Sequence, residues 1–116
     1  MNLEKFLGNI KNGVPVSFQE SIAVIAEHYD YTPTLFRNGD LINEAGVNEG
    51  SCKLFYFGRL HGLSPEQTLN LFGDFYRKDV LENPGGQNHG NIRAFMRSSW
   101  EGVVHEGEAL RRRAED

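Results

Sequence analysis

The sequence predicts one α+β domain that is mainly helical and contains a short β-hairpin. Apolar residues recur at helical spacing in five segments, and an Asn-Gly pair at residues 38–39 separates two short apolar runs, as in a hairpin. A chain of 116 residues with 39% hydrophobic content can build one core but hardly two. We expect a single domain over residues 1–107 and a disordered, charged tail over 108–116.

The N-terminal part combines two helices. Apolar spacing predicts a helix over 3–12. Ser17 and Glu20 have the spacing of a capping box, in which a hydroxyl and a carboxylate each satisfy a free backbone N–H. A second helix is therefore expected over 18–28.

The hairpin should follow these helices. Pro33 disfavours helix in the residue before it, and the Asn-Gly pair at 38–39 is a strong hairpin signal. We expect two short strands, over 34–37 and 40–42, with the turn at this pair.

The middle of the chain predicts a central helix and a capped one. Residues 51–61 are apolar on nearly every side, which is typical of a helix in the middle of a core. Ser64, Pro65 and Gln67 supply a cap, a first-turn proline and a capping-box glutamine, and predict a helix over 65–77.

The last third should hold a glycine-rich turn at 83–86, a helix over 91–99 and an extended segment over 100–105. Apolar residues from three of the helices should meet in the core. We expect Leu54, Phe57, Leu60, Leu69, Phe72 and Phe95 to be buried together.

Charge and composition exclude several classes of function. The net charge of −4 argues against nucleic-acid binding, because that affinity depends on clustered Lys and Arg, and the one basic run, 111–113, is followed by acids. No stretch approaches the roughly 20 apolar residues of a membrane span. A single cysteine, Cys52, excludes an internal disulfide and fits a reducing compartment. We expect a soluble protein in the cytoplasm.

One polar segment is the best candidate for recognition. The loop before the last predicted helix concentrates amides and an imidazole, and two arginines one turn apart follow it on the helix. Free N–H groups at a helix N-terminus attract anions, and such arginines can hold a carboxylate or phosphate. A tyrosine and an arginine beside the glycine-rich turn could line a cleft with them. The candidate binding residues are Tyr76, Arg77, Asn88, His89, Asn91, Arg93 and Arg97.

The alternative is a structural role for the same residues. Asn88 or Asn91 would cap the helix, and the arginines would pair with surface acids such as Asp74 and Asp79.

Catalysis and metal binding have weaker support. Cys52 near a helix N-terminus could be a nucleophile if His61, His89 or His105 lay beside it, but a free cysteine is usually a small buried apolar residue. No two histidines share a helix at the spacing of metal ligands. We expect no catalytic residue, no metal and no cofactor.

Five short runs together carry a family resemblance. They are Tyr31-Thr32-Pro33-Thr34, Gly50-Ser51-Cys52-Lys53, Leu63-Ser64-Pro65-Glu66-Gln67-Thr68, Phe75-Tyr76-Arg77 and His89-Gly90-Asn91-Ile92-Arg93. With them the chain resembles the HopJ family of small bacterial proteins, named after a type III secretion effector of a plant pathogen. The resemblance implies a small mixed α and β domain and a bacterial source. It brings no established activity, cofactor or catalytic residue, and its effector label implies secretion as the alternative to a cytoplasmic location.

Three functions from different classes are therefore open. The first is a non-enzymatic interaction protein of the HopJ type that acts on a protein partner. The second is a domain that binds a small anionic ligand, and the third is an enzyme that uses Cys52 or a histidine.

Overall fold

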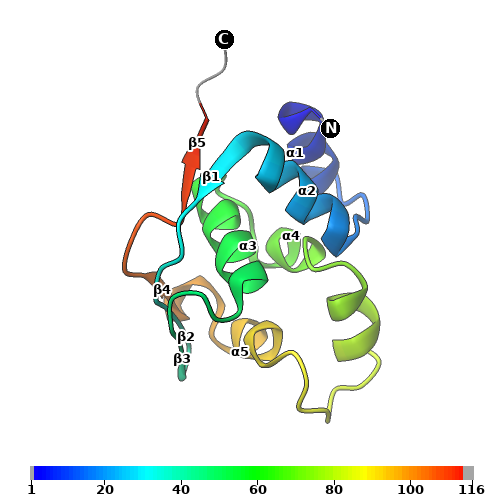
Figure 1. Cartoon of the computed structure of the whole chain (residues 1–116). Helices are drawn as coiled ribbons and strands as arrows, with labels where there is room; N and C mark the ends of the chain where they lie inside the picture. Colours follow the sequence, from blue (N-terminus) through cyan, green and yellow to red (C-terminus); the bar gives the residue numbers. More distant parts are fainter. Residues whose placement is uncertain (1, 114–116) are drawn as a thin grey trace.

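Helix α3 (Glu49–Leu60) lies at the centre of the molecule, between most of the other helices and the strands (Figure 1). The structure is a computed structural model that describes residues 2–113. The apolar side chains of α3 explain its central position, since Leu54, Phe55 and Phe57 are fully buried. The predicted α+β domain with a helix through its core is confirmed.

The other α-helices surround α3, and their caps follow the sequence. The capping box of Ser17 and Glu20 begins one helix, and that of Ser64 and Gln67, with Pro65 behind the cap, begins another. The four helices are α1 (Leu3–Lys11), α2 (Phe18–His28), α4 (Pro65–Asn70) and α5 (Gly90–Ser98).

The predicted helix over 65–77 is wrong in its second half. Helix α4 ends at Asn70, and a separate π-helix, η1 (Phe75–Val80), follows. Between them Gly73 has a φ of +62° and lies so close to α2 that a Cβ there would meet the backbone nitrogen of Phe18 at 2.6 Å. Only glycine fits this approach and this conformation, so the chain must leave the helix here.

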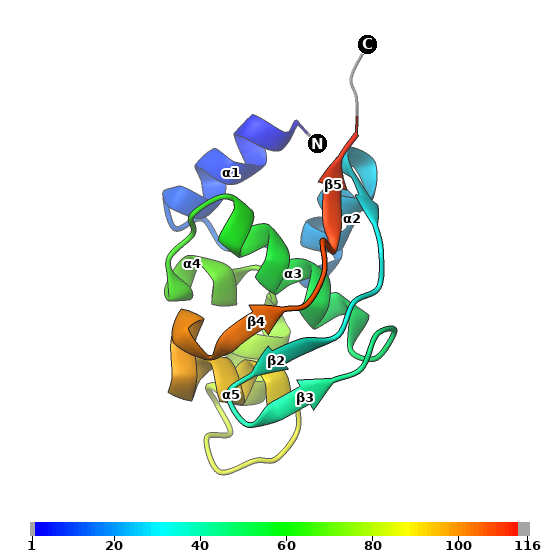
Figure 2. The same cartoon turned by 90° about the vertical axis from the view of Figure 1, so that its left-hand side faces the viewer.

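Three strands form one small antiparallel sheet in the order β3-β2-β4 (Figure 2). They are β2 (Phe36–Asn38), β3 (Leu41–Asn43) and β4 (Val103–His105). The hairpin lies one residue later than predicted. Asn38 belongs to β2 with a fully buried side chain, and the turn is at Gly39-Asp40, where Gly39 has a φ of +60°. The expected extended segment begins instead as a 3-10 helix, η2 (Ser99–Gly102).

A second, two-stranded sheet corrects the expected tail. Strand β1 (Tyr29–Tyr31) pairs antiparallel with β5 (Leu110–Arg112), and Arg113 bonds to Asp30 at 2.9 Å. Residues 110–112 are thus a strand, because Leu110 is buried and the backbone of β1 supplies hydrogen-bond partners. The remainder of the predicted tail, 114–116, lies outside the described residues.

The core is one apolar cluster with α3 at its centre. Phe55 contacts Phe95 and Phe72 with ring centroids 4.8 and 5.3 Å apart. Five of the six predicted core residues are buried, but Leu60 is 50% exposed, because the last residue of α3 lies at the surface. The buried five are Leu54, Phe57, Leu69, Phe72 and Phe95.

Candidate functional site

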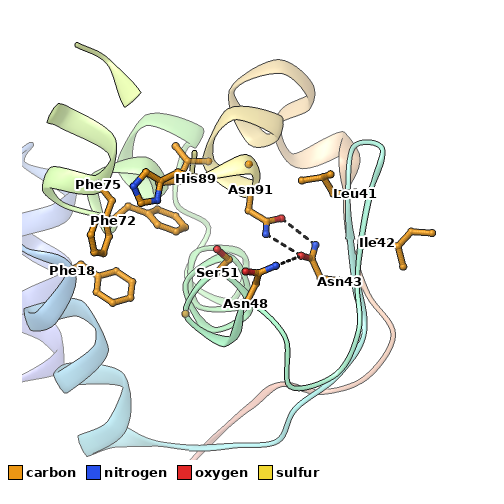
Figure 3. Close-up of a pocket in the computed structure, with 13 residues that line it drawn as sticks. Phe18, Leu41, Ile42, Asn43, Asn48, Ser51, Phe72, Phe75, His89 and Asn91 are labelled. Atoms are coloured by element: carbon orange, nitrogen blue, oxygen red, sulfur yellow. Dashed lines mark hydrogen bonds between the residues drawn. The ribbon is translucent and has the colours of Figure 1, made fainter. Parts of the chain in front are cut away.

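A hollow of about 530 Å³ lies where the first turns of α3 and α5 meet the β2-β3 hairpin (Figure 3). Pockets that take small ligands have volumes of this order, roughly 300 to 1,000 Å³. Aromatic side chains form one wall, asparagines the opposite side, and two hairpin residues the rim. The lining residues are Phe18, Leu41, Ile42, Asn43, Asn48, Gly50, Ser51, Phe72, Phe75, His89, Gly90, Asn91 and Ile92.

Two helix N-termini open into this hollow. The first backbone N–H groups of a helix have no partner within it and need an outside acceptor. Gly50 and Ser51 of α3, and Gly90, Asn91 and Ile92 of α5, all line the hollow, and among the described residues no acceptor reaches their N–H groups. The hollow therefore offers unused hydrogen-bond donors and the positive ends of two helix dipoles.

Neither helix is capped by the residue that precedes it. Asn48 and His89 occupy the N-cap positions, both with a φ of +54°, and neither side chain bonds to its own helix. The Asn48 amide donates to Oδ1 of Asn43 at 2.8 Å, and the His89 ring bonds to Asp79 at 2.9 Å. Asparagine is among the best N-cap residues, so its engagement elsewhere leaves the end of α3 open.

A network of buried asparagines holds the hairpin against α5. Asn43 and Asn91 exchange hydrogen bonds of 3.0 and 2.9 Å, and Asn38 donates to the carbonyl oxygen of Asn91 at 2.8 Å. All three side chains are nearly inaccessible to solvent. Hydrogen bonds between buried amides are geometrically demanding, so the network fixes how the two helix N-termini face each other.

The imidazole of His89 extends the aromatic wall of the hollow. The ring centroid of Phe75 lies 5.0 Å from the ring centroids of both Phe18 and His89. Asp79 forms a hydrogen bond with Nε2 of the His89 imidazole. Figure 3 shows these rings on one side of the hollow and the asparagines on the other. The arrangement can accept a ligand with an acceptor group for the helix ends and an apolar part for the rings.

The structure brings only two of the predicted binding residues, His89 and Asn91, into this hollow. Asn88 lies beside it and does not cap α5. Its side-chain oxygen and its carbonyl accept hydrogen bonds from Arg93, which also reaches the carbonyl of Pro84 at 3.2 Å. Arg93 thus stabilises the turn before α5. The structural alternative expected such a role for this arginine, but with a carboxylate as the partner instead of the carbonyl oxygens found here.

The other three predicted residues lie elsewhere. Tyr76 and Arg77 line a separate groove beside the end of α1. The Arg77 guanidinium donates to Asn70 and to the carbonyl of Val16, and lies 3.8 Å from Asp74. Arg97 lines another pocket with Arg93, between α5 and the turn that contains Pro84. The expected single cleft formed by all seven residues is therefore absent from the described structure.

The placement of Cys52 does not suit a nucleophile. The side chain is 1% exposed, its sulfur lies 3.9 Å from the Thr34 carbonyl, and burial raises the pKa of the thiol. His105 bonds to the backbone carbonyl of Cys52 rather than to the thiol. His61 bonds to the hydroxyl of Tyr29.

Other classes of site find no support within residues 2–113. No three His, Cys, Asp or Glu side chains in that range are grouped as a metal ion would require. In the same range, no helix has the length and apolar character needed to cross a bilayer.

Sequence reasoning missed most of the hollow. In the sequence, Phe18 and Phe75 belong to apolar helical patterns that are typical of core residues, and Asn43 and Asn48 lie in a polar segment that is typical of a loop. One signal was available: the segment between the hairpin and the central helix is rich in asparagine, glutamate and glycine, which is typical of backbone in left-handed conformations.

Comparisons with known proteins agree with the sequence resemblance. The family model described as HopJ type III effector protein matches residues 3–110. A crystal structure of the "unknown function protein VPA0580" is similar at 45% sequence identity with a TM-score of 0.95, covering 97% of this chain and 95% of that one. A comparison with curated proteins gave no match. A match over nearly the whole described chain means that this protein belongs to the HopJ type III effector family.

Proposed function

We propose that this HopJ-family protein is a non-enzymatic binding domain that holds a small anionic ligand in the hollow between α3 and α5. The observation that carries the proposal is the meeting of two uncapped helix N-termini at one concave, partly aromatic site. The absence of an activated thiol beside an imidazole among the described residues favours binding over thiol chemistry.

An anion fits this hollow for electrostatic reasons. Each helix end is equivalent to roughly half a positive charge, and its free N–H groups point at a ligand placed there. The nearest carboxylate to the imidazole, Asp79, is held by His89, and Glu49 at the first turn of α3 is exposed. A carboxylate or a phosphate group would satisfy donors that no group within residues 2–113 satisfies.

The aromatic rings of the hollow indicate that the rest of the ligand is apolar. Phe18 and Phe75 are half-buried and form one side of the hollow, while Leu41 and Ile42 remain exposed at its rim. Contact with a ligand would bury this apolar surface, which is favourable at roughly 25 cal/mol per Å². We therefore propose a ligand that joins an anionic group to an apolar ring or chain.

The biological role that we propose follows the family description. The family description is that of a type III effector, and action on a protein partner, in the bacterial cytoplasm or after secretion, is a prediction. A partner could present the same chemistry through a terminal carboxylate, and the test below separates that source from a free small molecule.

The proposal is tested by NMR titration of ¹⁵N-labelled protein with phenylphosphonate. We expect saturable shifts of the Gly50, Ser51, Gly90 and Asn91 amides. The variant Ser51→Asp places a carboxylate at the third position of α3, where it suits the helix dipole and occupies the anion position, and should weaken binding at least about tenfold. Ser51→Asn, of equal size but neutral, should retain binding. Shifts spread over the whole surface, or equal binding by both variants, would refute the proposal.

A second arm uses a tripeptide that ends in phenylalanine, as the free acid and as the amide. Binding of the acid in this hollow, with none of the amide, would identify a protein terminus as the source of the anion. Binding of phenylphosphonate but neither peptide would identify a free small molecule.

A further inference from the structure

The hollow has a neighbour on the other side of its aromatic wall. A second hollow of about 210 Å³ is lined by Phe18, Phe72 and Phe75, all shared with the first, and by Ser17, Gln19, Asp74 and Arg77. The floor, Phe72, is only 2% exposed. The half-buried pair of Phe18 and Phe75 is therefore the partition between two adjoining spaces.

We infer that Phe75 sets the length of the ligand, so that the hollow accepts an anionic ligand with one ring and excludes one with two rings in line. This inference rests on the proposed function. It adds a residue that determines specificity and a limit on the class of ligand.

The partition lies directly beside the proposed anion position. A Cβ on Gly50, in the first turn of α3, would be 2.9 Å from Cζ of Phe18. Phe75 contacts His89, the residue before the first turn of α5. A ring attached to an anion at these two helix ends must therefore lie against the Phe18–Phe75 pair, and a second ring in line would meet that pair.

Phe75 is the member of the pair that controls passage. Phe18 is held on both sides, since Gly50 packs against its ring and Gly73 packs against its backbone nitrogen. The Phe75 ring lies edge-on to Phe18, with an angle of 62° between the planes and centroids 5.0 Å apart, and it belongs to the π-helix η1. Shortening the Phe75 side chain would join the two hollows without moving α2.

The lining of the second hollow indicates which part of a longer ligand would enter it. The second hollow adds the Arg77 guanidinium, but this group already donates to Asn70 and Val16. The space beyond the partition thus contributes volume and apolar contact with Phe72 rather than a free anion-binding group. A longer ligand would gain by extending an apolar ring into it.

The experiment compares phenylphosphonate with biphenyl-4-ylphosphonate by NMR titration of wild type and Phe75→Ala. Wild type should bind the one-ring probe and reject the two-ring probe. In Phe75→Ala the ratio of two-ring to one-ring affinity should rise by about tenfold or more, since steric selection in apolar pockets is of this order. Phe75→Leu, which keeps an apolar group in place, should give an intermediate ratio and guards against loss of fold in the alanine variant.

Tyr56→Ala is the matched control, because Tyr56 is also half-buried but packs against His105 away from both hollows. Its ratio should equal that of wild type. If wild type binds phenylphosphonate and the ratio does not change in either Phe75 variant, the inference is wrong while the proposed function stands. If wild type binds neither probe in the hollow, the proposed function itself fails.

Discussion

Asn43 and Asn91 exchange two hydrogen bonds between the hairpin and the first turn of α5, with both side chains more than nine-tenths buried. The pair connects residues far apart in the sequence and lines the hollow. It therefore serves stability and the shape of the site at once.

Replacing either partner should be costly. Asn43→Ala leaves the buried Nδ2 of Asn91 without its acceptor, and Asn91→Ala does the same to the Nδ2 of Asn43, so each should lower the free energy of unfolding by about 1 to 3 kcal/mol. Urea denaturation measures the loss. The control Gln87→Ala removes an exposed amide and should stay within about 0.5 kcal/mol of wild type. Equal stability of all three variants would show that the pair contributes nothing.

Two glycines with the same φ allow the cost of backbone strain and the cost of steric crowding to be measured separately. Gly62 and Gly73 both have a φ of +62°, but a Cβ on Gly62 meets nothing within 4 Å, whereas one on Gly73 meets backbone at 2.6 Å. Gly62→Ala should cost about 1 to 2 kcal/mol for the left-handed conformation alone. Gly73→Ala should cost at least about 1 to 3 kcal/mol more, because α2 must move. Thermal or urea unfolding of the two variants side by side tests this, and equal losses would contradict the close approach.

The thiol of Cys52 should be unreactive in the folded protein. Burial raises its pKa, so the nucleophilic thiolate is scarce at neutral pH, and the sulfur is also shielded from reagents. Iodoacetamide should label native protein at least about tenfold more slowly than the same chain unfolded in urea. Rapid labelling of native Cys52 would instead indicate an activated thiolate and would favour the enzyme hypothesis.

Stability should fall in mild acid through His105. This imidazole stacks on Phe36 and contacts the edge of Tyr56, and burial lowers its pKa below the ordinary value of 6.5. Because the folded state prefers the neutral ring, its stabilising effect is complete above pH 6.5 and is lost as the pH falls through the lowered pKa.

Urea denaturation at pH 7.5 and pH 5.5 measures this effect. His105→Gln, which is neutral at both pH values, should show a smaller difference between them than wild type. His61 also has a pKa lowered by burial, so part of the acid dependence should persist in that variant and diminish further in the double variant with His61→Gln. An unchanged difference in both variants would contradict the assignment.

Local chemistry made the helices predictable. Ser17 and Ser64 fix helix starts through capping boxes that depend only on residues three positions apart. The apolar run after Gly50 identified the central helix because it has almost no polar face. Leu60 shows the limit of that pattern, since its place at the surface depends on where the helix ends.

The missed features depend on contacts between distant segments. Gly73 breaks a helix because α2 lies against it, and Asn38 is a strand residue because α5 supplies its acceptor. Strand β5 exists because β1 lies beside it. The hollow was invisible in the same way, since its walls come from α2, the hairpin, α3, η1 and α5, and only the fold brings them together.

The pairing of β1 with β5, and of β2 with β4, bears on how the protein is made. Both sheets join residues 29–38 to residues 103–112, so neither sheet can form completely until residues 103–112 have left the ribosome. Helices form from local contacts, whereas pairings between distant segments are slow to form. A nascent chain should therefore carry formed helices and open strand edges, which is the state that chaperones bind.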